Sequence, residues 1–124
     1  MNVGKVIYAL VNSSVPIYPV TAPQGETGTL AVYNVISCVP TNVKERVSVK
    51  DIYRVQITVM AETYAALMTA AETIRGLMDY KEGTYGTVPV DLIRFENQID
   101  NYNMETNEFS LSQDYFIRIK KLKI

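Results

Sequence analysis

The stretch Asp51-Ile-Tyr-Arg-Val-Gln-Ile-Thr-Val-Met60, together with the helical segment that follows it, decides the fold of this chain. Every second residue from Tyr53 to Val59 is apolar, which predicts a half-buried strand. From Tyr64 onward the apolar residues recur at the spacing of an amphipathic helix, and Thr63 is a suitable residue to cap its first turn. One strand therefore leads directly into one helix, and each has an apolar face that the other can cover.

The remaining segments add a second helix and further strands around this unit. Two prolines three residues apart exclude a helix between Val15 and Val20, so this segment is expected to be extended. The charged connector Val39–Lys50 is expected to form a long hairpin with a solvated tip. The other predicted elements are a helix over Asn2–Asn12, a strand over Leu30–Cys38, a loop over Tyr80–Pro89, and strands over Val90–Ile99 and from Phe109 to Lys120.

Neighbouring strands in this order are joined by loops, which favours antiparallel pairing. We therefore predict an α+β fold: a mostly antiparallel sheet of about four to five strands with two helices packed on one face. At 124 residues the chain is expected to be a single domain, 1–124, with a core that needs no metal or disulfide.

Composition excludes several classes of function. The formal net charge is −1 and the pI is about 5.4, so no overall field attracts nucleic acid or an anionic membrane. Cys38 is the only cysteine, which excludes an internal disulfide and favours a reducing compartment. No apolar run approaches the roughly 20 residues that cross a bilayer. These features predict a soluble intracellular domain without a specific nucleic-acid or membrane partner.

Candidate catalytic and metal-binding residues are few. The chain contains no histidine, the commonest general base and metal ligand, so we expect no catalytic, cofactor-binding or metal-binding residues. The alternative is a small α+β ligand-binding or enzymatic domain that uses the carboxylates of the last two strands. None of these carboxylates has a known ligand spacing, and a solvated acidic face is favoured: Asp91, Glu96, Asp100, Glu105, Glu108 and Asp114.

Candidate interaction residues lie in two places. The strand Val90–Ile99 carries apolar residues on both predicted faces, so Ile93 and Phe95 are candidates for an oligomer interface, together with Tyr102 in a predicted loop. Aspartate at position 93 or 95 is expected to leave the fold intact and to disrupt assembly. A second candidate is the charged tip of the connector, which is expected to project as an arm that contacts a partner: Lys44, Glu45 and Arg46.

Several segments resemble one known family. Ile17-Tyr-Pro-Val-Thr-Ala-Pro-Gln-Gly25 resembles the "IYP-x-x-APQG" segment of the small tail-completion proteins of long-tailed phages. The strand with Val32, Tyr33 and Ile36, and the strand and helix from Arg54 to Leu77, are similar to the elements that follow in that family. The resemblance covers Val3 to Asp79. The chain departs from the family pattern at Leu30-Ala31, where a proline is usual, and at Met60, where an aromatic residue is common.

The resemblance implies a structural role without catalysis or a cofactor. Proteins of this kind cap the head-proximal end of the tail tube and help to join the tail to the head. By resemblance, the partners would be further copies of the chain in a ring, most simply a hexamer, together with the tail tube protein and the head connector proteins. The protein would lie in the neck of a virion, after assembly in the bacterial host cytoplasm. Another neck component, such as a head-closure protein, is the alternative within the same particle.

Overall fold

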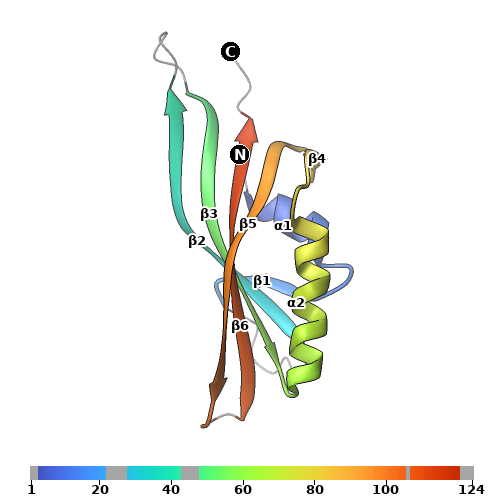
Figure 1. Ribbon diagram of the computed structural model, residues 1–124. Helices are drawn as coiled ribbons and strands as arrows, with labels where there is room; N and C mark the ends of the chain where they lie inside the picture. Colours follow the sequence, from blue (N-terminus) through green and yellow to red (C-terminus); the bar gives the residue numbers. More distant parts are fainter. Residues whose placement is uncertain (1–2, 22–27, 43–47, 106, 121–124) are drawn as a thin grey trace.

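The computed structural model describes residues 3–21, 28–42, 48–105 and 107–120, which form two helices and one six-stranded sheet (Figure 1). The helices are α1 (Val3–Val11) and α2 (Tyr64–Met78). Neither is long and apolar enough to cross a membrane, within the part of the chain that is described. The strands are β1 (Ile17–Pro19), β2 (Leu30–Asn42), β3 (Ser48–Ala61), β4 (Gly83–Tyr85), β5 (Val88–Asn103) and β6 (Glu108–Lys120).

The sheet has the strand order β1-β2-β3-β6-β5-β4. β1 pairs with β2 in parallel, whereas the other neighbours are antiparallel, so the sheet is mixed. The predicted fold class, a mostly antiparallel sheet of about four to five strands, is therefore wrong. β4 lies in the glycine-containing segment that was expected to be a loop, and β2, β3 and β5 are longer than their apolar alternation indicated.

The unit around which the chain folds is confirmed. Val55, Ile57 and Val59 of β3 are fully buried, and α2 starts directly after the Thr63 side chain, whose hydroxyl oxygen accepts from the Ala66 amide at 3.1 Å. This bond satisfies one of the amides that a helix N-terminus leaves without an intrahelical partner. The strand and helix therefore meet through apolar faces that the sequence places at the correct spacing.

Both helices lie on the same side of the sheet, and the core lies beneath them (Figure 1). α2 contacts β3, β6 and β5, while α1 contacts α2 and the two ends of the sheet at β1 and β4. The turn between β4 and β5 approaches α1 closely: a Cβ added to Gly86 would lie 2.8 Å from the Lys5 carbonyl oxygen. Gly86 also has φ +56°, which glycine adopts without steric cost.

Two hairpins extend to opposite ends of the molecule (Figure 1). The β2–β3 ladder extends from Leu30↔Met60 to Asn42↔Ser48, and the β5–β6 ladder extends from Val90↔Ile119 to Asn103↔Glu108. The segment expected to be a charged connector is thus largely strand. Beyond the region that the helices cover, the side chains of residues 35–40 in β2 and 96–103 in β5 are exposed, and these two stretches lie toward opposite ends of the protein.

Candidate functional site

The face of the sheet opposite the helices, here called the far face, carries a hollow of about 370 Å³. Three half-buried apolar side chains from three adjacent strands line it: Ile52, Leu92 and Phe116. Backbone register places Arg118 between Ile52 and Leu92, and it pairs Phe116 with Arg94. We call this the far-face hollow, with a lining of Ile52, Leu92, Arg94, Phe95, Glu96, Phe116 and Arg118.

Positive charge dominates the surroundings of the far-face hollow. Lys50 donates to Asp91 at 2.9 Å, and this hydrogen bond lowers the pKa of the Asp91 carboxyl, with smaller contributions from the nearby Lys120 and Arg118 charges. Arg54 forms an ion pair with Asp114 at 3.3 Å and lies 5.7 Å from the Phe116 ring centroid. Two local carboxylates are therefore already engaged by cations.

Arg118 and Lys120, at the end of β6 next to the hollow, add further positive charge. Both side chains are exposed. Arg94 is also exposed, and its guanidinium lies 4.8 Å from the Tyr80 ring centroid at the edge of the sheet. An arginine on an aromatic ring keeps its charge and its donors available to a partner. The hollow therefore offers an apolar floor, and its border carries Arg94 and Arg118 together with one exposed carboxylate, Glu96.

The turn end of the β5–β6 hairpin is acidic, in contrast to the basic surroundings of the far-face hollow. Residues 97–113 contain three acidic residues and no lysine or arginine. Ile99 and Met104 are 68% and 81% exposed in this segment, and Tyr102 is 42% exposed. We call this end of the hairpin the acidic tip, which comprises Ile99, Asp100, Tyr102, Met104, Glu105 and Glu108. Backbone register places Ile99 on the far face, and Asp100 and Tyr102 on the helix side.

Aromatic contacts hold the acidic tip to the start of α2. The Tyr64 ring meets the edge of Phe109 at 5.8 Å between centroids, and Tyr102 packs on Phe109 at 4.7 Å. The Tyr64 hydroxyl donates to Asp100 at 3.1 Å, and this bond to the carboxylate raises the pKa of Tyr64. These contacts pack the acidic tip against the start of α2.

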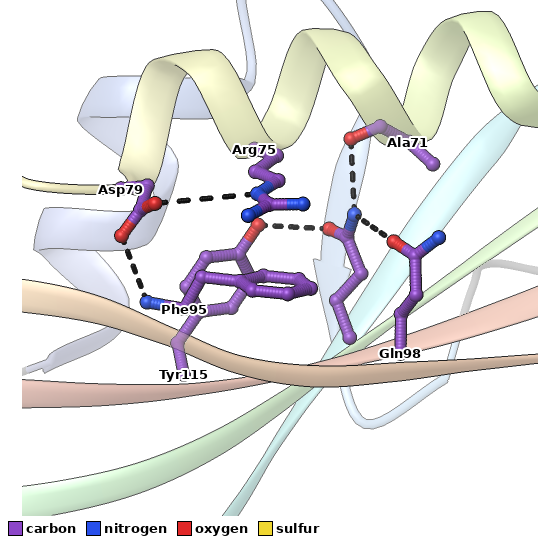
Figure 2. A network of polar contacts seen from close by, with 7 residues as sticks. Ala71, Arg75, Asp79, Phe95, Gln98 and Tyr115 are labelled. Carbon is purple, nitrogen blue, oxygen red and sulfur yellow. Dashed lines mark hydrogen bonds and ion pairs between the residues drawn. The ribbon is translucent and has the colours of Figure 1, made fainter.

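A buried polar network joins α2 to the base of the same hairpin (Figure 2). Gln113 is fully buried; its amide donates to the Ala71 carbonyl at 3.0 Å and to Gln98 at 3.2 Å. The Tyr115 hydroxyl donates to the Gln113 oxygen at 2.9 Å. Burial raises the pKa of Tyr115, because the phenolate would lose its hydration there. These bonds fix the orientation of the hairpin relative to the helix.

Asp79 and Arg75 extend this contact along the end of α2 (Figure 2). The Asp79 carboxylate accepts from the Phe95 amide at 2.9 Å, and it lies 4.0 Å from the Arg75 guanidinium. The same guanidinium is 3.9 Å from the Phe95 ring centroid. Phe95 is consequently half-buried by an arginine of its own chain.

The predicted interface residues occupy different environments. Ile93 is fully buried in the core beneath α2, so its side chain is not accessible to a partner and aspartate there would disrupt the fold. The expectation that aspartate at this position leaves the fold intact is therefore wrong. Phe95 is half-buried under Arg75, and Tyr102 is exposed on the acidic tip. Lys44, Glu45 and Arg46, the predicted arm, lie outside the described residues.

The candidate carboxylates do not converge. Register places Asp114 opposite Asn97, while Asp100, Glu105 and Glu108 lie toward the other end of the hairpin. Among the described residues, no group of three or more His, Cys, Asp and Glu side chains could hold a metal ion. Cys38 is exposed on the β2 ladder. Burial raises the pKa of the neighbouring Tyr53 to about 12, and a side-chain hydrogen bond with Cys38 adds to this shift.

Sequence reasoning missed the far-face hollow, although one signal was present. Ile52, Leu92 and Phe116 are apolar residues at positions that alternate with the core residues. A shallow groove of about 420 Å³ between α2 and the start of β1 was also missed. It is lined by small side chains such as Ala65, Ala66 and Thr69, which carry no titratable group.

Comparisons with known proteins concern the fold. No protein-family model matches the sequence, and no curated protein sequence matches it. Solved structures share this fold. One of them is a chain of the structure described as "Virion of native gene transfer agent (GTA) particle", with a TM-score of 0.70 and 14% sequence identity. The match covers 94% of this chain and 85% of that chain, so it includes both helices and the sheet rather than one motif.

Proposed function

We propose that this protein is a structural component of a phage or phage-like virion, in which it caps the head-proximal end of the tail tube and helps to join the tail to the head. The observation that carries the proposal is the fold, which a chain of a gene transfer agent virion shares over nearly its whole length. The resemblance of Ile17–Gly25 to the tail-completion proteins of long-tailed phages supports the more specific position in the neck.

The surfaces of the molecule are those of an assembly protein. Among the described residues no group of three or more His, Cys, Asp and Glu side chains could hold a metal ion, whereas apolar and charged side chains are exposed on long strand ladders. We propose that the protein is not an enzyme, needs no cofactor, and acts as a closed ring of identical subunits, most simply a hexamer. Its partners are then the tail tube protein on one side of the ring and head connector proteins on the other.

Removal of the gene from a strain that produces the particles tests this function. We expect tails of uncontrolled length that are not joined to heads, as measured by electron microscopy, and restoration by the intact gene. Tails of normal length that fail to join filled heads would instead assign the protein to head closure, the alternative neck role. Particles of normal appearance and infectivity without the protein would contradict both.

A further inference from the structure

The described surface separates its charges along the β5–β6 hairpin. The acidic tip carries Asp100, Glu105 and Glu108, whereas Arg94, Arg118 and Lys120 surround the far-face hollow at the other end of the same ladder. Both ends also expose apolar surface, with Ile99 and Met104 on the tip. Two surfaces of opposite charge, each with an apolar centre, have the composition of complementary halves of one interface.

The two surfaces cannot meet within one molecule. Arg118 lies nine positions along β6 from Phe109, the residue opposite Tyr102. At the rise of a β-strand this separation is about 30 Å. The buried contacts of Gln113 with α2 hold the intervening ladder in place. Any contact between the tip and the hollow must therefore join two copies of the chain.

We propose that the acidic tip of one copy docks in the far-face hollow of the next. This inference rests on the ring of the proposed function and names the surfaces that form it. Met104 and Ile99 pack on Ile52, Leu92 and Phe116, and Glu105 and Glu108 face the guanidinium groups of Arg94 and Arg118. The flexible side chain of methionine suits an irregular apolar hollow.

The geometry of this contact leads to a closed assembly. Each copy offers one tip and one hollow, so the contact is heterologous, and such contacts form a ring wherever the rotation between copies closes. Tip and hollow lie at opposite ends of the hairpin, which leaves both free to act at the same time. The separated charges also disfavour the two alternative pairings, tip with tip and hollow with hollow, through like-charge repulsion.

Charge reversal tests the contact at both of its halves. We expect the tip variant Glu105→Lys/Glu108→Lys and the hollow variant Arg94→Glu/Arg118→Glu each to weaken self-association by about tenfold or more at low salt. All four side chains are exposed, so both variants should keep the circular dichroism spectrum and melting temperature of the wild type. Glu72→Lys, an equivalent reversal on the exposed surface of α2, is the matched control and should not change association.

A mixture of the two variants provides a sharper result. The lysine tip of one variant faces the glutamate hollow of the other, and the native tip of the second faces the native hollow of the first. An equimolar mixture should therefore assemble into rings of strictly alternating variants, with an even number of subunits, as measured by sedimentation and native mass spectrometry. If the mixture associates no better than either variant alone, tip and hollow are not partners.

Cysteine cross-linking extends the test to assembled particles. In a Cys38→Ser background, Leu92→Cys with Met104→Cys should give a ladder of disulfide-linked oligomers, whereas Leu92→Cys with Glu72→Cys should not. Equal ladders from both pairs, or none from either, would overturn the contact. If particles with the tip variant keep normal tails and intact rings while loss of the whole protein abolishes them, the docking proposal fails and the proposed function stands. Normal particles without the protein would instead remove the proposed function itself.

Discussion

Substitution of Gln113 by leucine should reveal how strongly the buried network secures the hairpin to α2. Leucine is similar in size and places an apolar side chain at this buried position, but it removes the donor to the Ala71 carbonyl and the acceptor of the Tyr115 hydroxyl, which is itself buried. A buried hydroxyl without a partner costs about 1–3 kcal/mol. Gln98 is exposed and can bond to water instead, so its lost contact adds little. We expect Gln113→Leu to lower the free energy of unfolding by about 2 kcal/mol.

The partner substitution, Tyr115→Phe, keeps the ring in the core and leaves the Gln113 oxygen without its donor. It should also cost about 1–3 kcal/mol. In the double variant neither orphaned group remains, so the combined loss should be smaller than the sum of the single losses. We expect a coupling energy of at least about 1 kcal/mol between the two positions.

Urea unfolding followed by far-UV circular dichroism measures these energies. The dependence of the unfolding free energy on urea should be the same in all variants, because the substitutions do not change the surface that unfolding exposes. Gln98→Ala, at the exposed edge of the network, is the control and should cost less than about 0.5 kcal/mol. Additive losses from Gln113→Leu and Tyr115→Phe, within about 0.5 kcal/mol, would refute the inference that the two side chains depend on each other.

Three further measurements test other parts of the fold. Gly86→Ala should destabilise the protein by more than about 1 kcal/mol through its positive φ and the Lys5 carbonyl, whereas Gly76→Ala, with open space around it in α2, should stabilise it by about 0.5–1 kcal/mol in chemical denaturation. Thr63→Ala should cost about 1 kcal/mol by the same assay, and Thr63→Ser should retain most of the stability. Because burial raises the pKa of Tyr115, its contribution to stability is present below the unfolded tyrosine pKa of about 10 and is lost as the pH rises above it; Tyr115→Phe should flatten this alkaline loss of melting temperature.

The central strand and helix were predictable because burial and pairing coincide there. Val55, Ile57 and Val59 alternate on a strand that has a helix above it, so the pattern in the sequence reports the pattern of contacts. Residues 35–40 of β2 and 96–103 of β5 are exposed on both faces of the strand. Hydrogen bonds between strands hold the backbone there, and the sequence shows no alternation of apolar and polar residues. Hydrophobic periodicity detects buried segments only. The strands predicted from it were therefore too short, and β4 was not predicted.

Two bulges explain the incorrect assignment of faces in β5. Register shifts between Val90 and Leu92 and between Phe95 and Asn97 each move the following residues to the other face of the sheet. As a result Val90, Ile93 and Phe95 all lie on the helix side. Strict alternation would instead place Val90 on one face, and Ile93 and Phe95 on the other. The apparent second apolar face that pointed to Ile93 therefore does not exist there. The apolar surface that does exist on the far face comes from Leu92 and its neighbours.

The net charge of −1 predicted no nucleic-acid or anionic membrane partner. The distribution of charged residues in the structure explains why the total charge is a poor guide to assembly. Acidic residues at the tip and basic residues at the hollow nearly cancel in the sum. Asp100 and Arg94 are nevertheless five positions apart along the ladder, which is about 17 Å or about two Debye lengths at physiological salt, so the two groups act as separate surfaces. A subunit that joins identical neighbours head to tail needs two unlike surfaces on one chain. Under the proposed docking, near-neutral composition with separated charges satisfies that requirement, because each surface would attract the opposite surface of the next copy and repel its own kind. For such a protein the distribution of charge along the sheet, and not its sum, determines which partners it can bind.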